Sequence, residues 1–197
     1  MKTIVTLVLG AIMSNAALAE DGKLPMFPQV EIKTSQGTFV VELDGRRAPI
    51  SVQNFVKYVQ DGFYDGTVFH RVISGFVAQA GGFDENLQEK ETRDPIPNES
   101  GNGLSNVRGT IAMARMGAPH TGTAQFYINL ASNRNLDPTS SRWGYCVFGQ
   151  VTDGMDTLDK IAAIPTTARK PFRSDFPETV VTIESARLIK ETPPASQ

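Results

Sequence analysis

The 197-residue chain is poor in the side chains that most often carry covalent or metal-assisted chemistry. It has one cysteine, Cys146, and two histidines, His70 and His120. A lone cysteine cannot form an intramolecular disulfide, so the fold must depend on its hydrophobic core. The histidines and the cysteine lie far apart in the sequence and lack the spacing of metal ligands. We therefore expect no metal site and no cofactor.

Several enzyme classes have local motifs that this chain lacks. It has no G-x-S-x-G elbow to expose a serine nucleophile and no G-x-G-x-x-G or Walker-type loop to hold phosphate. No motif supports a paired-carboxylate hydrolase, although spacing alone does not exclude one. His70 is interpreted as a hydrogen-bonded structural histidine, His120 as an exposed loop residue and Cys146 as a buried strand thiol. The run RKPFR at residues 169–173 is interpreted as a solvated loop.

Long apolar runs are also scarce, and the clearest one lies at the N-terminus. Met1-Lys2 precede the apolar residues 4–13, and Ala17-Leu18-Ala19 follow them. This order predicts a secretory signal peptide over residues 1–19 that is cleaved after Ala19. A membrane anchor is the alternative, but a spanning helix needs about twenty apolar residues, roughly twice this run. No cysteine follows the run, which argues against a lipoprotein.

The predicted cleavage sets the expected location and organisation of the mature chain. We expect a periplasmic protein, with full secretion as the alternative, and no membrane insertion after cleavage. Loss of Lys2 leaves 18 basic against 21 acidic residues, and the absence of a basic cluster argues against nucleic acid as the main partner. We expect a lead-in at 20–28, one domain at 29–190 and a disordered tail at 191–197. The default oligomeric state is a monomer.

The predicted elements are many short strands separated by turns, with only two helices. Two helices are too few for the crossovers of a parallel sheet. The fold class is therefore mainly β, a closed eight-stranded antiparallel β-barrel capped by two α-helices. Strands are expected at 30–34, 38–43, 110–114, 125–130, 145–151 and 180–189, two more within 69–83, helices from Pro49 and from Asp153-Gly154, and a long loop at 84–103 with an extended piece at Ile96-Pro97.

The segment FHRVISGFVAQAGGF, residues 69–83, contains the most informative polar residues of the chain. Arg71 lies in an otherwise apolar strand, and a guanidinium is costly to bury without a partner. It therefore pairs with another residue or faces a ligand. Phe76 and Gln79 are three positions apart, so strict alternation cannot place both on one side of a strand. Phe76 must then enter from the turn at Ser74-Gly75, or the second strand must be irregular.

A positioned guanidinium, an amide side chain and many apolar groups cannot perform covalent catalysis, but they could bind a peptide and alter the torsional preference of one bond. The segment resembles the F-H-R-V-I-x-G-F-x-x-Q-x-G signature of the cyclophilins, the barrel-shaped peptidyl-prolyl cis–trans isomerases. GTIAMAR, AQFYINL, Asn135-Leu136-Asp137 and YCVFGQV follow in the family's order and spacing. With the predicted signal peptide, the likeness is closest to the periplasmic cyclophilins of Gram-negative bacteria.

The resemblance implies a role for twelve residues and a partner. The partner would be a proline-containing segment of an exported protein, and the enzyme would isomerise its X-Pro bond. The alternative is a chaperone or scaffold module in which the same groove binds proline peptides and isomerisation is incidental. Arg71, Gln79 and Phe76 would be catalytic, and Val77, Met113, Ala114, Arg115, Gln125, Tyr127, Asn135, Leu136 and Tyr145 would bind substrate, with Ala114 and Arg115 offering backbone hydrogen bonds and Phe126 facing the core.

Five residues depart from the commonest family pattern: Ser74, Val77, Ala80, Tyr127 and Asn135. Val77 shortens the floor of the pocket, and Tyr127 adds a hydroxyl that needs a partner or water. Asn135 stands where many members have tryptophan or phenylalanine, and that aromatic residue is linked in the family to tight binding of the inhibitor cyclosporin.

We therefore predict that cyclosporin binds this protein weakly. The reason is the loss of an aromatic ring at Asn135. The measurement is inhibition in a proline-peptide isomerisation assay, with Asn135→Trp as the variant expected to bind more tightly. Nanomolar inhibition of the unmodified protein would contradict the prediction.

Overall fold

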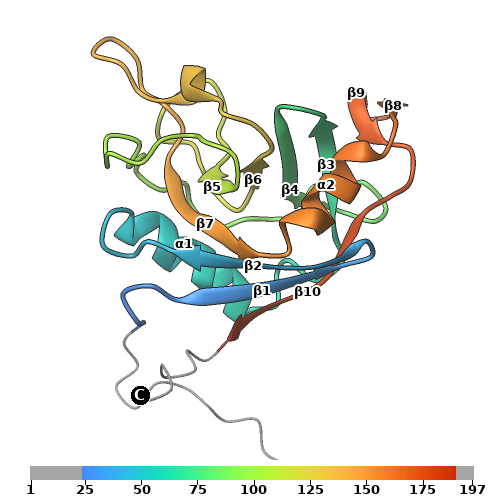
Figure 1. Cartoon of the computed structure of the whole chain (residues 1–197), viewed down its shortest axis with the longest axis horizontal. Helices are drawn as coiled ribbons and strands as arrows, with labels where there is room; N and C mark the ends of the chain where they lie inside the picture. The colour runs from blue at the N-terminus through green and yellow to red at the C-terminus, as the bar shows by residue number, and fades with distance from the viewer. Residues whose placement is uncertain (1–23, 190–197) are drawn as a thin grey trace, which may run out of the picture.

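Eight antiparallel strands form a closed barrel in the computed structural model, which describes residues 24–189 (Figure 1). Their order around the barrel is β1-β10-β3-β4-β6-β5-β7-β2. The predicted barrel is therefore confirmed, while the predicted signal peptide and C-terminal tail lie outside the described residues. The strands are β1 (Gln29–Thr34), β2 (Gly37–Leu43), β3 (Thr67–Ile73), β4 (Val77–Asp84), β5 (Thr110–Met113), β6 (Phe126–Asn129), β7 (Val147–Asp153) and β10 (Thr182–Ile189).

The first hairpin follows directly from its polarity pattern. Ile32 of β1 and Phe39 of β2 face each other in the register and are both buried. The turn between them closes through Gly37, whose φ of +130° is a conformation that L side chains rarely adopt. The Thr34 hydroxyl donates to the carbonyl of Gly37 over 2.7 Å. This is the alternating hairpin that the sequence predicts.

Helices α1 (Pro49–Gln60) and α2 (Met155–Ala163) lie on opposite sides of the barrel (Figure 1). In α1, Pro49 stands at the start, where a missing N–H costs nothing, and Phe55 is among the buried residues. The free N–H groups of its first turn need acceptors. The Glu99 carboxylate of the long loop supplies them, accepting from the backbone N–H groups of Ile50 and Ser51 at 3.1 and 2.8 Å. Both predicted helices are confirmed.

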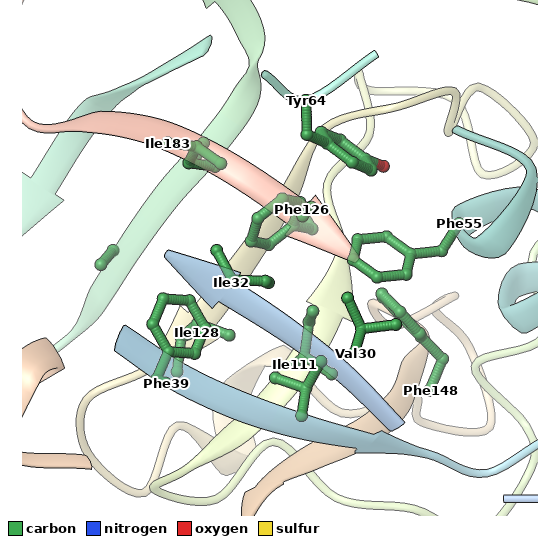
Figure 2. Packing of buried hydrophobic residues seen from close by; sticks show 14 of the residues in the cluster. Val30, Ile32, Phe39, Phe55, Tyr64, Ile111, Phe126, Ile128, Phe148 and Ile183 are labelled. Carbon is green, nitrogen blue, oxygen red and sulfur yellow. The ribbon is translucent and has the colours of Figure 1, made fainter. Parts of the chain in front are cut away.

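The interior of the barrel is filled by aromatic and branched side chains (Figure 2). The Phe55 ring of α1 meets Phe126 edge-on at 5.5 Å and lies 5.1 Å from Tyr64 and 5.3 Å from Phe148. The Tyr64 hydroxyl donates to the Ala124 carbonyl at 2.9 Å, which satisfies its buried polar atom. Phe126 thus faces the core, as predicted. Because side chains fill the barrel, any binding site must lie on its outer wall.

One connecting segment differs from its sequence interpretation. Residues 169–173 are not simply a solvated loop, because β8 (Thr166–Arg169) and β9 (Phe172–Pro177) form a separate two-stranded sheet. Phe172 is half-buried against the rings of His70 and Phe83. The basic residues on both sides of Phe172 in the sequence gave no sign of this burial. The predicted extended piece at Ile96 is confirmed, since it forms an isolated bridge with Gly122. A 3-10 helix, η1 (Arg134–Leu136), lies between β6 and β7.

No helix among residues 24–189 is both long and apolar enough to cross a bilayer.

Candidate active site

The register of three neighbouring strands determines which polar side chains of the site lie beside one another. Arg71 of β3 pairs with Gln79 of β4, and Gln79 pairs with Tyr127 of β6. Side chains of residues that face each other in this way lie on the same side of a sheet. The three side chains therefore form one row across the outer wall of the barrel.

A pocket of about 270 Å³ opens beside this row. All of the residues that line it are among the twelve that the resemblance implies. They come from β3, β4, β6 and η1 and from the segments that flank β4, β5 and β7. The lining consists of Arg71, Phe76, Val77, Gln79, Ala114, Arg115, Tyr127, Leu136 and Tyr145.

Phe76 enters the pocket from the turn before β4, which is one of the two arrangements that the spacing allows. β4 begins at Val77, and the φ of Gly75 is +70°, which bends the chain sharply ahead of Phe76. Val77 and Gln79 then share one face of the strand. The Phe76 carbonyl accepts from the backbone N–H of Leu130 and from Asn133 Nδ2, each at 2.8 Å. These bonds fix the turn and with it the ring.

Three of the twelve residues do not line this pocket. Met113 packs with the barrel interior, because β5 alternates and only its neighbours Ala112 and Ala114 pack beside Val77 and Tyr127 on the outer wall. Met113 is therefore not part of this pocket and instead lines a separate cavity that shares Arg115. Gln125 contacts the site only through Gln79, and Asn135 is exposed on η1.

Arg71 has two polar neighbours, of which the sequence suggested one. Its Nη1 donates to Gln79 Oε1 at 3.5 Å, and Gln79 Nε2 donates in turn to Gln125 Oε1 at 2.9 Å. Arg71 Nε also lies 3.8 Å from Asp175 Oδ2. Sequence reasoning missed Asp175, which is 104 positions further along the chain and carries no local motif. With 40% of its side chain exposed, Arg71 can reach a ligand in the pocket.

Tyr127 forms part of the pocket wall, and its hydroxyl has the partner that its burial demands. The hydroxyl donates to Asn106 Oδ1 at 2.7 Å, and Asn106 Nδ2 donates to Asp137 Oδ1 at 2.9 Å. Burial raises the pKa of Tyr127 well above its ordinary value. The group is therefore neutral, and its ring presents an apolar surface to the pocket.

Arg115 closes one side of the pocket and is fully engaged in holding loops together. Its Nε, Nη1 and Nη2 atoms donate to the carbonyls of Gly144, Met116 and Trp143 at 3.3, 2.9 and 3.0 Å. Its guanidinium also lies over the Tyr145 ring, 4.5 Å from the centroid. These contacts make Arg115 part of the wall. The backbone N–H of Ala114 is also occupied, since it donates to the Gln125 carbonyl at 3.0 Å.

The remaining titratable residues near the site are structural. His70 lies between the rings of Phe83 and Phe172, at centroid distances of 4.8 and 5.4 Å. Its Nδ1 has no hydrogen-bond partner among the described residues. The buried ring is nevertheless structural, as expected, because it packs between two aromatic rings. His120 is exposed, as predicted, and Cys146 is buried, with burial raising its thiol pKa to about 11. Residues 24–189 contain no cluster of three or more His, Cys, Asp or Glu that could hold a metal ion.

The barrel and its pocket define a cyclophilin-type isomerase. The family described as "Cyclophilin type peptidyl-prolyl cis-trans isomerase/CLD" matches residues 29–188. The chain belongs to this family and is a peptidyl-prolyl cis–trans isomerase.

Curated and solved relatives agree with this assignment. The chain is 47% identical over 162 residues to peptidyl-prolyl cis–trans isomerase B of Escherichia coli, covering 81% of this chain and 98% of that protein. It is 46% identical to peptidyl-prolyl cis–trans isomerase A of Dickeya dadantii, covering 82% and 85%. A crystal structure of a Cryptosporidium parvum cyclophilin in the presence of the dipeptide Ala-Pro is similar with a TM-score of 0.68 and 26% identity, covering 82% of this chain and 99% of that one.

The buried His70 predicts a loss of stability in acid. Burial, the largest cause, and the adjacent Arg71 charge lower its pKa from 6.5 to about 4. The unfolded chain takes up this proton before the folded one does, so the free energy of unfolding falls as the pH drops from 6.5 to 4. Above pH 6.5 the group makes no such contribution.

We expect His70→Gln to flatten this decline and the exposed-residue variant His120→Gln to leave it unchanged. The measurement is urea unfolding followed by circular dichroism at several values between pH 7 and pH 4. Equal pH dependence in the unmodified protein and in His70→Gln would refute the role assigned to His70.

Proposed function

We propose that this isomerase accelerates rotation about X-Pro bonds in exported proteins and that Arg71 is its catalytic residue. The observation that carries the proposal is the place of the Arg71 guanidinium, half-exposed at the edge of an apolar pocket. Its Nη2 group makes no hydrogen bond to the residues between 24 and 189. An N–H donor is thus available to a peptide bound there.

The chemistry of the amide explains why such a donor helps. The peptide C–N bond resists rotation because the nitrogen lone pair is delocalised into the carbonyl, with a barrier of about 18–20 kcal/mol. Twisting the bond localises that lone pair and makes the nitrogen basic. Arg71 would then find an acceptor in the twisted state that is nearly absent in either planar state. Such differential binding lowers the barrier.

Arg71 cannot account for the whole acceleration. Uncatalysed isomerisation takes tens to hundreds of seconds, so a rate of about 10³ per second needs a factor of about 10⁵, or roughly 7 kcal/mol. A hydrogen bond from a charged donor contributes about 1.5–3 kcal/mol. The remainder must come from the apolar pocket, which removes water from the amide and fits the twisted form best.

The lining of the pocket suits a proline ring. Phe76, Val77 and Leu136 supply apolar surface. The Tyr127 hydroxyl is bonded to Asn106, so the part of Tyr127 that lines the pocket is its ring. The solved cyclophilin studied in the presence of Ala-Pro supports this substrate class by similarity. A proline-containing segment of a polypeptide is therefore the proposed substrate.

We expect Arg71→Ala to lower kcat/KM for a proline peptide by about 10- to 150-fold, which corresponds to a lost charged hydrogen bond. Arg71→Lys keeps the charge without the planar fork and is expected to recover only part of the activity. The matched control is Arg47→Ala, an exposed arginine paired with Asp44. The measurement is peptide isomerisation monitored by exchange spectroscopy.

Wild-type activity in Arg71→Ala would remove Arg71 from the mechanism. If that variant lost isomerase activity but kept its cellular function, the proline-binding chaperone or scaffold module would be the correct description.

The export of the protein is a separate prediction. Expression of the full chain in a Gram-negative host is expected to give a periplasmic product that begins at Glu20, because residues 1–19 have the order of a signal peptide. Ala19→Arg, which places a large charged residue at the cleavage site, is expected to leave the precursor uncut. N-terminal sequencing and mass spectrometry give the result. A cytoplasmic product that retains Met1 would contradict export, and a mature form found in the medium would indicate secretion.

A further inference from the structure

Asp175 is the one carboxylate within ion-pair distance of Arg71 among residues 24–189. Asp175 Oδ2 lies 3.8 Å from Arg71 Nε, and the exposed fractions of the two side chains are 33% and 40%. The residue belongs to β9, in the small sheet that the chain forms between α2 and β10. This hairpin lies near β3 and β4 at one edge of the molecule (Figure 1).

Aromatic contacts fix the hairpin against the strand that carries Arg71. The Phe172 ring of β9 stacks with His70, the residue before Arg71, at 5.4 Å. It also meets Phe83 at 4.9 Å and stacks with the fully buried Phe176 at 5.5 Å. Residues on both sides of Asp175 are therefore anchored, so its backbone has a defined position relative to Arg71.

The local conformation of Asp175 also favours its orientation. Its φ is +64°, in the left-handed region, where aspartate and asparagine are better tolerated than most other residues. The Ser174 hydroxyl donates to Asp175 Oδ2 at 2.9 Å. The carboxylate is thus restrained by its own turn before it meets the guanidinium.

Three different contacts hold the Arg71 guanidinium. Asp175 lies on its Nε side, Gln79 accepts from Nη1, and the Phe76 ring centroid is 6.0 Å from Cζ. The Gln79 bond, at 3.5 Å, is at the long limit for a hydrogen bond and restrains the side chain weakly. Arginine has much rotamer freedom to lose. A second restraint, on the edge of the guanidinium opposite Nη1, limits the rotation that the Gln79 bond leaves free.

We propose that Asp175 is a positioning residue that orients Arg71 for isomerisation, an inference that rests on the proposed function of Arg71. The β8–β9 hairpin is then part of the catalytic apparatus although it contributes no residue to the pocket lining. Both charges are partly exposed, so water and salt screen their attraction. The contribution of Asp175 is orientation, which affects the twisted state more than the binding of the planar peptide.

The kinetic test uses two variants that keep the backbone conformation. Asp175→Asn retains tolerance of the left-handed region without the charge, and Asp175→Gly adopts a φ of +64° without a side chain. We expect both to lower kcat by about twofold to fivefold with little change in KM, the range of a partly exposed ion pair. The matched control is Asp159→Asn, which removes the carboxylate that pairs with Arg108 at 2.8 Å. Its kcat is expected to stay at the wild-type value.

A spectroscopic test separates orientation from a structural effect. The side-chain Nε–H signal of Arg71, assigned by its disappearance in Arg71→Lys, is expected to shift and broaden in Asp175→Asn. The backbone amide signals of Phe172 and Phe176 are expected to stay in place, because the hairpin remains docked.

The outcomes distinguish the positioning role of Asp175 from the catalytic role of Arg71. If Asp175→Asn keeps the wild-type kcat and an unchanged Arg71 signal while Arg71→Ala is impaired, the inference is wrong and the role of Arg71 stands. If Arg71→Ala is fully active, the proposed mechanism fails, and the Arg71 signal alone then decides whether Asp175 holds the side chain. Loss of the Phe172 and Phe176 signals in both Asp175 variants would reassign Asp175 to hairpin folding and overturn the positioning role.

Discussion

The backbone register across β3, β4 and β6 is the constraint on which the site depends. Hydrogen bonding between these strands sets Arg71 opposite Gln79 and Gln79 opposite Tyr127. A shift of one residue in any strand would turn its pocket-facing side chain into the barrel interior. The packed core opposes such a shift, because it would move the fully buried Phe126 and Ile128 from the inner face of β6 to the outer wall.

Two arginines of the pocket have the same chemistry and opposite roles, and their surroundings decide which is which. The guanidinium of Arg115 donates to several backbone carbonyls and lies over Tyr145, so its hydrogen-bonding capacity is satisfied within the protein. Arg71 has only a long contact to Gln79 and a loose ion pair. Hydrogen-bonding groups without a partner are costly in a structural residue, but in Arg71 they leave a donor for a ligand.

Short strands separated by turns are enough to predict the barrel. The spacing of Phe76 and Gln79 limits the site to two arrangements, of which the structure has the turn entry. Alternation along β5 places Met113 with the barrel interior, whereas the family resemblance alone implies a place for it in the pocket. The pairing of Asp175 with Arg71 could not be read from the sequence. The β8–β9 hairpin has an exposed first strand and a left-handed residue that interrupts its second, so it has no clear periodicity.

The filled barrel interior has a consequence for what the enzyme can act upon. Since the pocket lies on the outer wall, among Val77, Ala114 and Tyr127, a polypeptide meets it by lying across the surface. No chain end has to be threaded through a tunnel, and no size limit is set by an enclosing cavity. From this geometry we expect a proline in the middle of a long chain, or in an exposed loop of a folded domain, to reach the pocket as a proline in a short peptide does.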